Sequence, residues 1–179
     1  MTAAIIIGAV VLVAVMWYIG TFNGIKVAQL KVKEALSGID VALTKRYDVL
    51  TKMVDVVKGY QKHEKELLTE VISLRMGMSM QERNAANAQM NALADKLNVF
   101  VENYPELKAS ANFAELQKAI LDVEEHLQAA RRMYNANVTS YNAKLVMFPS
   151  SVVAGAMGAT PEEFFAAEEA KRADVKMDF

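Results

Sequence analysis

IDVALTKRYDVLTKMVDVVKGYQKHEKELLTEVISLR, from Ile39 to Arg75, is the stretch that decides the fold. Its apolar residues recur in alternating steps of three and four, which places them on one continuous face of an α-helix. These residues are Ile39, Leu43, Tyr47, Leu50, Val54 and Val57, and Leu36, just before the stretch, continues the same face. Such a helix gains most of its stability by packing that face on other helices. The sequence therefore predicts an all-α protein, an antiparallel bundle of long helices.

An apolar N-terminal segment precedes this bundle. Residues 3–19, AAIIIGAVVLVAVMWYI, are an unbroken apolar run, and a helix needs about 17 to 25 such residues to cross a bilayer. Nothing basic precedes the run and bulky residues end it, which argues against a cleavable signal peptide. We therefore predict a retained single transmembrane helix within residues 1–24. Its membrane residues are Ile5, Ile6, Ile7, Val11, Leu12, Trp17 and Tyr18.

Charges next to this anchor predict its orientation. Lys26, Lys31 and Lys33 follow the apolar run and only the amino terminus precedes it. By the positive-inside rule, the bundle faces the cytoplasm. Ala4 and Gly8 form a small-x-x-x-small pair, a spacing that lets membrane helices approach closely.

Two further long helices follow the first. Gly20, Asn23 and Gly24 are candidates for a hinge after the anchor, and a break is expected near residues 59–62. A second helix, antiparallel to the first, is predicted over residues 81–103, ending before Pro105. A third helix is predicted from the N-cap Asn112 to a stop at Pro149. Its apolar seam consists of Phe113, Leu116, Ile120, Val123, Leu127, Ala130, Tyr134, Val138, Tyr141, Leu145 and Phe148.

The chain beyond residue 149 changes character. Residues 150–159 are small and apolar, and we expect a loosely structured flap there. Thr160, followed by Pro-Glu-Glu, has the pattern of a helix start, so a short C-terminal helix is predicted from it to Arg172. The organisation is thus an anchor (1–24), a bundle (25–149) and a C-terminal segment (150–179). Candidate contacts of this last segment with lipid or another copy are Val152, Val153, Met157, Phe164 and Phe165.

Residue types that carry chemistry are sparse. The chain has no cysteine and a formal net charge of −1, which excludes thiolate chemistry and disfavours nucleic acid. The residues three before His63 and His126 are Tyr60 and Val123, so neither histidine completes the Glu-x-x-His of a di-iron bundle. His63-Glu64 likewise lacks the second histidine of a zinc protease. We therefore expect no catalytic, cofactor or metal site, no small-molecule substrate, and a non-enzymatic protein.

Polar residues border the apolar seams and form one candidate interaction cluster. They are Arg46, Tyr47, His63, Glu64, Arg75, Glu124, Arg131, Arg132, Asn135 and Asn142. A recognition surface is one interpretation of this cluster. The other is structural, since charges beside a seam fix the register of helices and keep the exposed face soluble.

Several segments together resemble the LemA family of bacterial membrane-anchored proteins. These segments are Asp40-Val41, Lys45 to Asp48, Val57 to Tyr60, His63 to Lys65, Tyr104 to Ala109, Asn112-Phe113, Glu124, Ala130 to Arg132, Tyr134-Asn135, Tyr141-Asn142 and Phe148-Pro149. Thr51-Lys52 and Glu125 depart from the family pattern. The resemblance implies a helical bundle on one span of the inner, cytoplasmic membrane of a bacterium, and no established activity or cofactor.

The function expected from these features is interaction. Apolar residues outside the three long helices predict a scaffold that self-associates and organises membrane or membrane proteins. Its expected partners are membrane lipid, through the N-terminal helix, and further copies of the chain. The alternative is an adaptor or regulator of a membrane-bound protease or signalling protein, which would bind that partner through the polar cluster.

Overall fold

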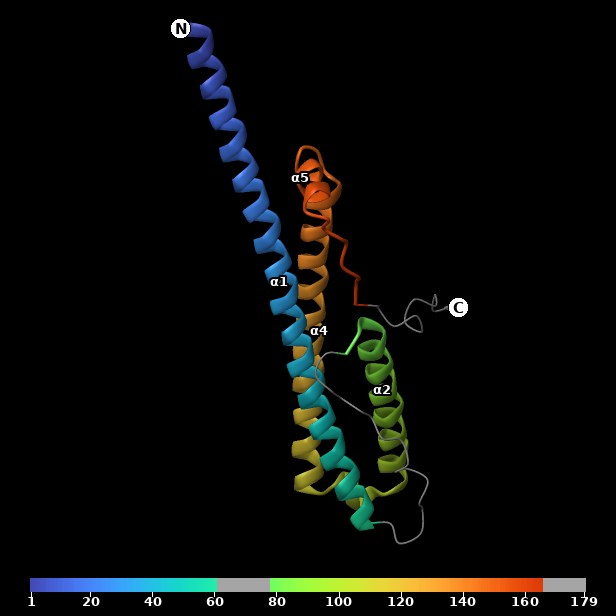
Figure 1. Cartoon of the computed structure of the whole chain (residues 1–179). Helices are drawn as coiled ribbons and strands as arrows, with labels where there is room; N and C mark the ends of the chain where they lie inside the picture. Colours follow the sequence, from blue (N-terminus) through green and yellow to red (C-terminus); the bar gives the residue numbers. More distant parts are fainter. Residues whose placement is uncertain (61–77, 166–179) are drawn as a thin grey trace, which may run out of the picture. The chain divides into compact units, whose positions relative to one another are not determined.

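A computed structural model describes residues 1–60 and 78–165, and every element in these ranges is a helix (Figure 1). The helices are α1 (Thr2–Tyr60), α2 (Met80–Asn103), α3 (Pro105–Lys108), α4 (Ala111–Val146) and α5 (Ser150–Ala156). The chain forms two compact units: the first joins Met1–Gly38 to Ala130–Phe164, and the second joins Ile39–Ala129 to Phe165–Phe179. The predicted all-α fold is confirmed.

Helix α1 runs from the apolar N-terminal segment into the bundle residues without a break. The prediction of a hinge at Gly20, Asn23 and Gly24 is wrong, because all three lie inside α1. A glycine costs a helix about 1 kcal/mol relative to alanine but removes no backbone hydrogen bond. Helix-forming neighbours on both sides therefore carry the helix through. Of the break predicted near residues 59–62, Gly59 and Tyr60 are the last residues of α1. Residues 61–77 lie outside the described residues.

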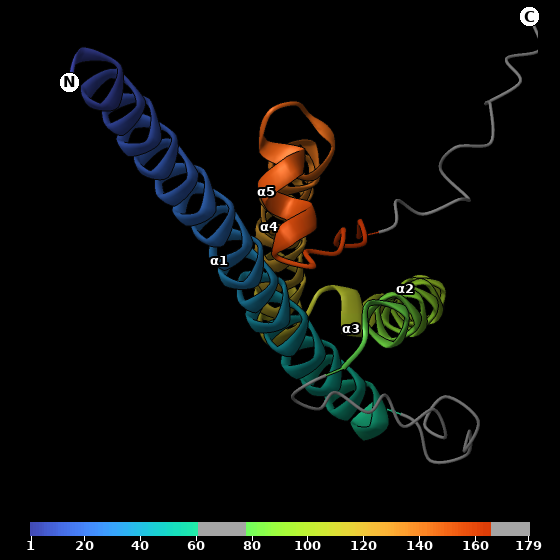
Figure 2. The same cartoon turned by 45° about the horizontal axis from the view of Figure 1, so that its top comes forward.

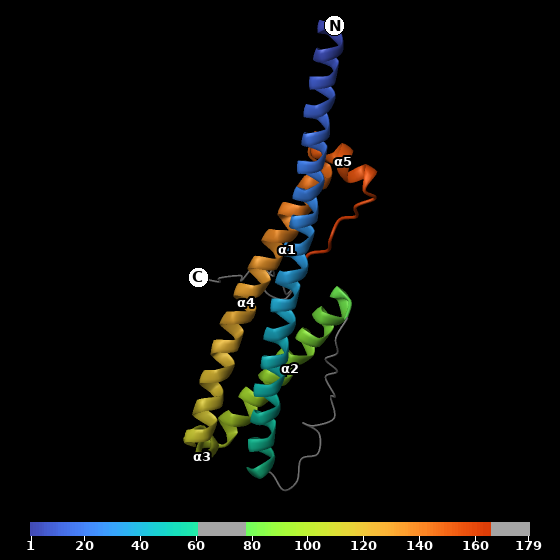
Figure 3. The same cartoon turned by 60° about the vertical axis from the view of Figure 1, so that its left-hand side comes forward.

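In the first unit, α1 and α4 pack antiparallel (Figure 3). The Asn137 side-chain amide of α4 donates a hydrogen bond of 3.2 Å to the Lys31 carbonyl of α1. Ile25 of α1 and Tyr141 of α4 are buried in this unit. Every residue of α1 up to Gly20 is exposed, and the buried face of the helix begins at Ile25.

The second unit is a three-helix arrangement of α1, α2 and α4. Leu43, Leu50, Met90, Leu97 and Leu127 are buried in it. The described contacts from α1 to α2 ascend together along both helices, from Asp40 with Arg83 to Arg46 with Asn87. Helix α2 is therefore parallel to α1.

Helix α4 runs antiparallel to both, as the predicted bundle requires (Figure 1). The predicted second helix is present, but the prediction that it runs antiparallel to the first helix is wrong. A short connection makes neighbouring helices antiparallel. The connection from Tyr60 to Met80 is long enough to span the length of a helix, so α2 can begin near the middle of α1 and run parallel to it.

Side chains and prolines define where α2 and α4 begin and end. Ser79 and Glu82 form a capping box at the start of α2, with reciprocal bonds of 3.2 and 2.7 Å. Helix α2 ends at Asn103, before Pro105, as predicted. Ser110 Oγ accepts a 3.2 Å hydrogen bond from the Phe113 amide, so Ser110 caps α4 in place of the predicted Asn112.

The predicted seam of α4 is correct except at its end. All its positions from Phe113 to Leu145 are buried or half-buried, whereas Phe148 is exposed. The reason is that α4 ends at Val146, so the helical period no longer applies two residues later.

A short C-terminal helix is present, but it is α5 (Ser150–Ala156), within residues 150–159 where a loosely structured flap was predicted, so that prediction is wrong there. Of the helix predicted from Thr160 to Arg172, residues 160–165 are not helical, and residues 166–172 lie outside the described residues. Helix α5 folds back beside the end of α4 (Figure 1, Figure 2). Gly158 has a φ of 60°, a left-handed conformation that suits glycine, and ends α5. The amides of Gly158 and Ala159 donate to the carbonyls of Gly155 and Ala154, which is the Schellman motif. Residues 160–165 are not helical, because side chains of α4 bind their backbone, as described below.

Candidate interaction sites

Arg46 is a buried positive charge among the three helices of the second unit. Arg46 is only 3% exposed. Its guanidinium donates a 2.7 Å hydrogen bond to Asn87 Oδ1 of α2 and forms an ion pair with Glu124 of α4. A buried charge is costly unless it is paired and hydrogen-bonded, so these two contacts fix the register of α2 and α4 on α1.

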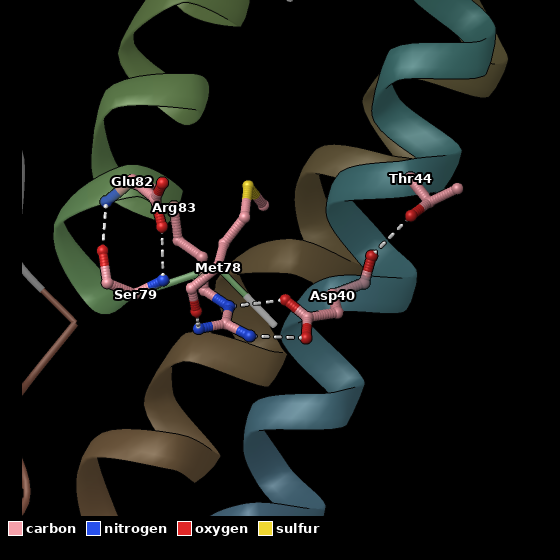
Figure 4. A network of polar contacts seen from close by, with 6 residues as sticks. All are labelled: Asp40, Thr44, Met78, Ser79, Glu82 and Arg83. Carbon is pink, nitrogen blue, oxygen red and sulfur yellow. Dashed lines mark hydrogen bonds and ion pairs between the residues drawn. The ribbon is translucent and has the colours of Figure 1, made fainter. Parts of the chain in front are cut away.

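Arg83 makes a second polar link, from α2 to α1 (Figure 4). Its Nε and Nη2 donate hydrogen bonds of 2.6 and 2.8 Å to the two carboxylate oxygens of Asp40. Its third nitrogen, Nη1, donates to the Met78 carbonyl. This bidentate geometry is the strongest form of an arginine–carboxylate contact and orients both helices at once.

Sequence reasoning missed Arg83 and Asn87, although a signal was present. They lie seven and three residues before the buried Met90, so they occupy the same helix face as the apolar seam of α2. Polar residues at seam positions are either paired or exposed, and here they are paired with Asp40 and Arg46. Extending the apolar period backward into the polar start of α2 would have found them.

In the first unit, three side chains of α4 hold the segment Thr160–Glu163. Asn142 donates to the Glu162 carbonyl at 2.9 Å and accepts from the Glu162 amide at 3.0 Å. The hydroxyl of Tyr141 donates to the Thr160 carbonyl at 3.1 Å, and that of Tyr134 donates to the Glu163 carbonyl at 2.7 Å. We call this arrangement the α4 clasp. It satisfies the backbone of the segment without helical hydrogen bonds.

The clasp changes the acidity of one of its tyrosines. Burial raises the pKa of Tyr141 above its ordinary value, and the negative charge of Glu162 raises it further. The neutral phenol is therefore the favoured form in the folded chain, and it is the form that donates to the Thr160 carbonyl.

The described members of the predicted polar cluster belong to both units. Arg46 and Glu124 meet in the second unit, and Tyr47 of that unit is half-buried. The α4 members in the first unit are Arg131, Arg132, Asn135 and Asn142, of which Arg132 is exposed and the others are half-buried. His63, Glu64 and Arg75 lie outside the described residues. The contacts that are described link helices and segments of the chain to one another, as the structural interpretation requires.

The C-terminal candidates for lipid or oligomer contact divide by exposure. Val153 and Phe165 are buried within the chain, so the prediction that they contact lipid or another copy is wrong. Val153 faces inward because α5 buries one side of its helix, together with the neighbouring Ala154. Val152 and Phe164 are exposed and Met157 is half-buried, and for these three the contact stays a prediction.

The anchor residues are all exposed. Ile5, Ile6, Ile7, Val11, Leu12, Trp17 and Tyr18 each leave more than a third of their surface uncovered. Helix α1 is long and apolar enough to cross a membrane, and no residue of its most apolar stretch is buried. Residues 1–60 and 78–165 hold no group of three or more histidines, aspartates or glutamates that could bind a metal ion.

Comparisons with known proteins give two matches. The model of a family described as the LemA family matches residues 35–179, which include most of the bundle and begin after the apolar stretch of α1. A protein of Metamycoplasma hominis named Protein LemA is 31% identical over 163 residues. That alignment covers 88% of this chain and 74% of the relative.

Proposed function

Because the chain belongs to the LemA family, we propose that it is a membrane-anchored, non-enzymatic scaffold that self-associates and organises membrane or membrane proteins. Its place is the inner membrane of a bacterium, which α1 crosses once, with the bundle facing the cytoplasm. The observation that carries the proposal is apolar surface that begins in the exposed stretch of α1 and continues onto the outer face of the same helix.

The first support is the exposure of the N-terminal stretch. Leaving such a stretch in water is unfavourable by about 25 cal/mol for each Å² of apolar surface. A bilayer removes that cost, and a helix satisfies its own backbone hydrogen bonds inside it. Lys26, Lys31 and Lys33 follow the stretch and suit the cytoplasmic side.

The second support is the outer face of α1 just beyond that stretch. Val27 and Leu30 lie one helical turn apart and are 53% and 66% exposed. Ile25, Ala28 and Val32 of the same turns are buried, so the two exposed residues lie on the opposite face of α1. An exposed apolar pair beside a membrane helix suits contact with the same helix of a second copy.

The third support is that charged side chains pair with one another between helices. The guanidiniums of Arg46 and Arg83 and the carboxylates of Asp40 and Glu124 join helices of one unit. Groups committed to such contacts stabilise the bundle, which favours a structural role over an enzymatic one.

The decisive experiment is the mass of the full-length protein in mild detergent, with negative-stain images of the same fractions. The variant Val27→Gln with Leu30→Gln removes the apolar pair and keeps residues that favour helix. We expect the natural chain to give a particle of several copies and this variant to shift toward the single-chain mass of 19.8 kDa.

A matched control is Leu121→Gln with Met133→Gln, which removes two equally exposed apolar side chains from α4. The control should assemble like the natural chain. A natural chain that stays monomeric at high concentration contradicts self-association. Equal losses in both double variants contradict the assignment to α1.

The adaptor alternative is separated by crosslinking in native membranes. A photoreactive residue at position 30 should capture mainly a second copy if the protein is a scaffold. A single heterologous membrane protein captured in place of a second copy would instead identify an adaptor or regulator.

A further inference from the structure

One corner of the first unit, the turn between α4 and α5, exposes four apolar side chains. We call Val146, Met147, Phe148 and Val152 the apolar corner; each is between 62% and 84% exposed, and Phe148 most of all. Burying a side chain of this size contributes about 1.5 to 3 kcal/mol, so leaving four together in water is unfavourable. A contiguous exposed patch of this kind indicates a contact surface.

The corner is a fixed part of the fold. Val153 and Ala154 of α5 are buried, which sets the face that Val152 presents outward. The Met147 carbonyl accepts hydrogen bonds from the Ser151 amide at 2.8 Å and the Ser150 hydroxyl at 2.9 Å. The Met147 amide donates to the Ala143 carbonyl at 2.9 Å. The backbone of the turn at Met147 is thus satisfied from within, as a layer poor in water requires.

The corner lies beside the end of the apolar stretch of α1. Pro149 and Ser150, which lie between Phe148 and Val152 in the chain, line one groove of about 390 Å³ with residues of α1. The other residues of this groove are Trp17, Gly20, Thr21, Gly24, Ile25 and Lys144. Trp17 lies near the end of the apolar stretch, and tryptophan is enriched where a membrane helix passes the headgroups. The corner therefore lies at the level of the membrane surface.

Charge in the first unit suits an anionic membrane surface. The sequence holds no aspartate or glutamate before Glu34 and none from Leu127 to Pro161. Over the same segments it carries Lys26, Arg131 and Lys144, among other basic residues. Lys144 lines the groove next to the corner. Each basic residue close to an anionic leaflet contributes roughly 1 kcal/mol of attraction.

From these observations we propose that the apolar corner inserts into the headgroup layer of the bilayer that α1 spans. Phe148, Met147 and Val152 contact the ends of the acyl chains nearest the headgroups, and Lys144 lies at an anionic headgroup. The protein then meets its membrane twice, through the span and through the α4–α5 turn. The inference rests on the proposed anchoring by α1.

The test measures the depth of single spin labels on the full-length protein in vesicles of phosphatidylcholine and phosphatidylglycerol. The chain has no cysteine, so each introduced cysteine is labelled alone. Met147→Cys reports the corner, Val11→Cys reports the span, and Met133→Cys reports an exposed position of α4. Collisions with oxygen mark an apolar environment, and collisions with a water-soluble nickel chelate mark water.

We expect the oxygen-to-nickel ratio at position 147 to exceed that at position 133 several-fold and to approach that at position 11. Adding Phe148→Ser and Val152→Ser should return the ratio at 147 toward that at 133 and leave position 11 unchanged. These substitutions are on exposed residues, so they leave the buried core intact.

Three outcomes overturn the proposal, and they differ in whether they also reject the proposed anchoring by α1. Equal ratios at 147 and 133 with a high ratio at 11 reject the corner and leave the anchor standing. A low ratio at 11 rejects the anchoring, and with it the proposed function. Spin–spin broadening at 147 that vanishes on dilution with unlabelled chain shows that a second copy, not lipid, covers the corner.

Discussion

Arg83 and Asp40 share two hydrogen bonds but differ in burial: the arginine side chain is 7% exposed, and that of its aspartate partner is 40% exposed. Removing the aspartate takes both carboxylate contacts of this link from a buried guanidinium. Removing the arginine leaves a carboxylate that water already reaches. The cost of breaking this link therefore depends on which partner is removed.

The first prediction tests this asymmetry. Asp40→Ala should lower the free energy of unfolding by about 2 to 3 kcal/mol, and Arg83→Met by only ~1 kcal/mol. Both values come from urea unfolding of the full-length protein in one detergent, followed by circular dichroism. Equal losses, or a larger loss for Arg83→Met, would contradict the argument from burial.

The second prediction concerns the pair of Arg46 and Glu124. A double-mutant cycle with Arg46→Met and Glu124→Gln should give a coupling free energy of roughly 1 to 3 kcal/mol, because the arginine is buried. The exposed pair of Lys58 and Asp55, 3.0 Å apart within α1, is a matched control. Its coupling should stay below about 0.5 kcal/mol. Additive losses for Arg46 and Glu124 would show that the pair does not act as a unit.

The third prediction concerns the α4 clasp. Asn142→Ala removes both hydrogen bonds to Glu162 and should speed proteolytic cleavage near residues 160–163, with helix content unchanged. Asn142→Asp keeps an acceptor for the Glu162 amide but loses the donor, so its effect should be intermediate. Ser140→Ala, an exposed change on the same helix, is the control. Cleavage at the natural rate in Asn142→Ala would mean that the clasp does not hold the segment.

The fourth prediction is a loss of clasp stability at high pH. The pKa of Tyr141 is raised in the folded state. Its contribution is therefore fully present below the ordinary tyrosine pKa of about 10 and is lost as pH rises through that value toward the raised one. Absorbance at alkaline pH should show a late phenol transition, and Tyr141→Phe should abolish it. If the late transition disappears in Tyr134→Phe and persists in Tyr141→Phe, it does not belong to Tyr141 and the prediction is contradicted.

Periodicity was sufficient to predict the main helices, and it failed where helices end or turn. The seam from Phe113 to Leu145 was correct because a helix repeats its faces regularly as long as it continues. Phe148 was assigned to the core because nothing in the apolar pattern marks that α4 ends at Val146. The direction of α2 likewise depends on the connection before it, which spacing within helices does not determine.

The contacts of the candidate sites were harder to predict than the helices. Arg46 and Glu124 were both chosen from sequence, but as members of a larger polar cluster and not as a pair. The clasp was missed because its acceptors are backbone carbonyls, which every residue possesses. A Thr-Pro-Glu-Glu pattern suits a helix start, yet in this fold three side chains of α4 bind the same backbone, which is not helical.

The unbroken course of α1 has a mechanical consequence. Because Gly20 and Gly24 lie inside one continuous helix, the apolar stretch and residues 25–38 form a single helical rod. When that stretch lies in a bilayer, any tilt or rotation imposed by bilayer thickness is passed directly to the helix face that holds Ile25 and Val32. The orientation of the first unit then follows the thickness of that bilayer, because α1 has no loop at Gly20 or Gly24 that could absorb the motion.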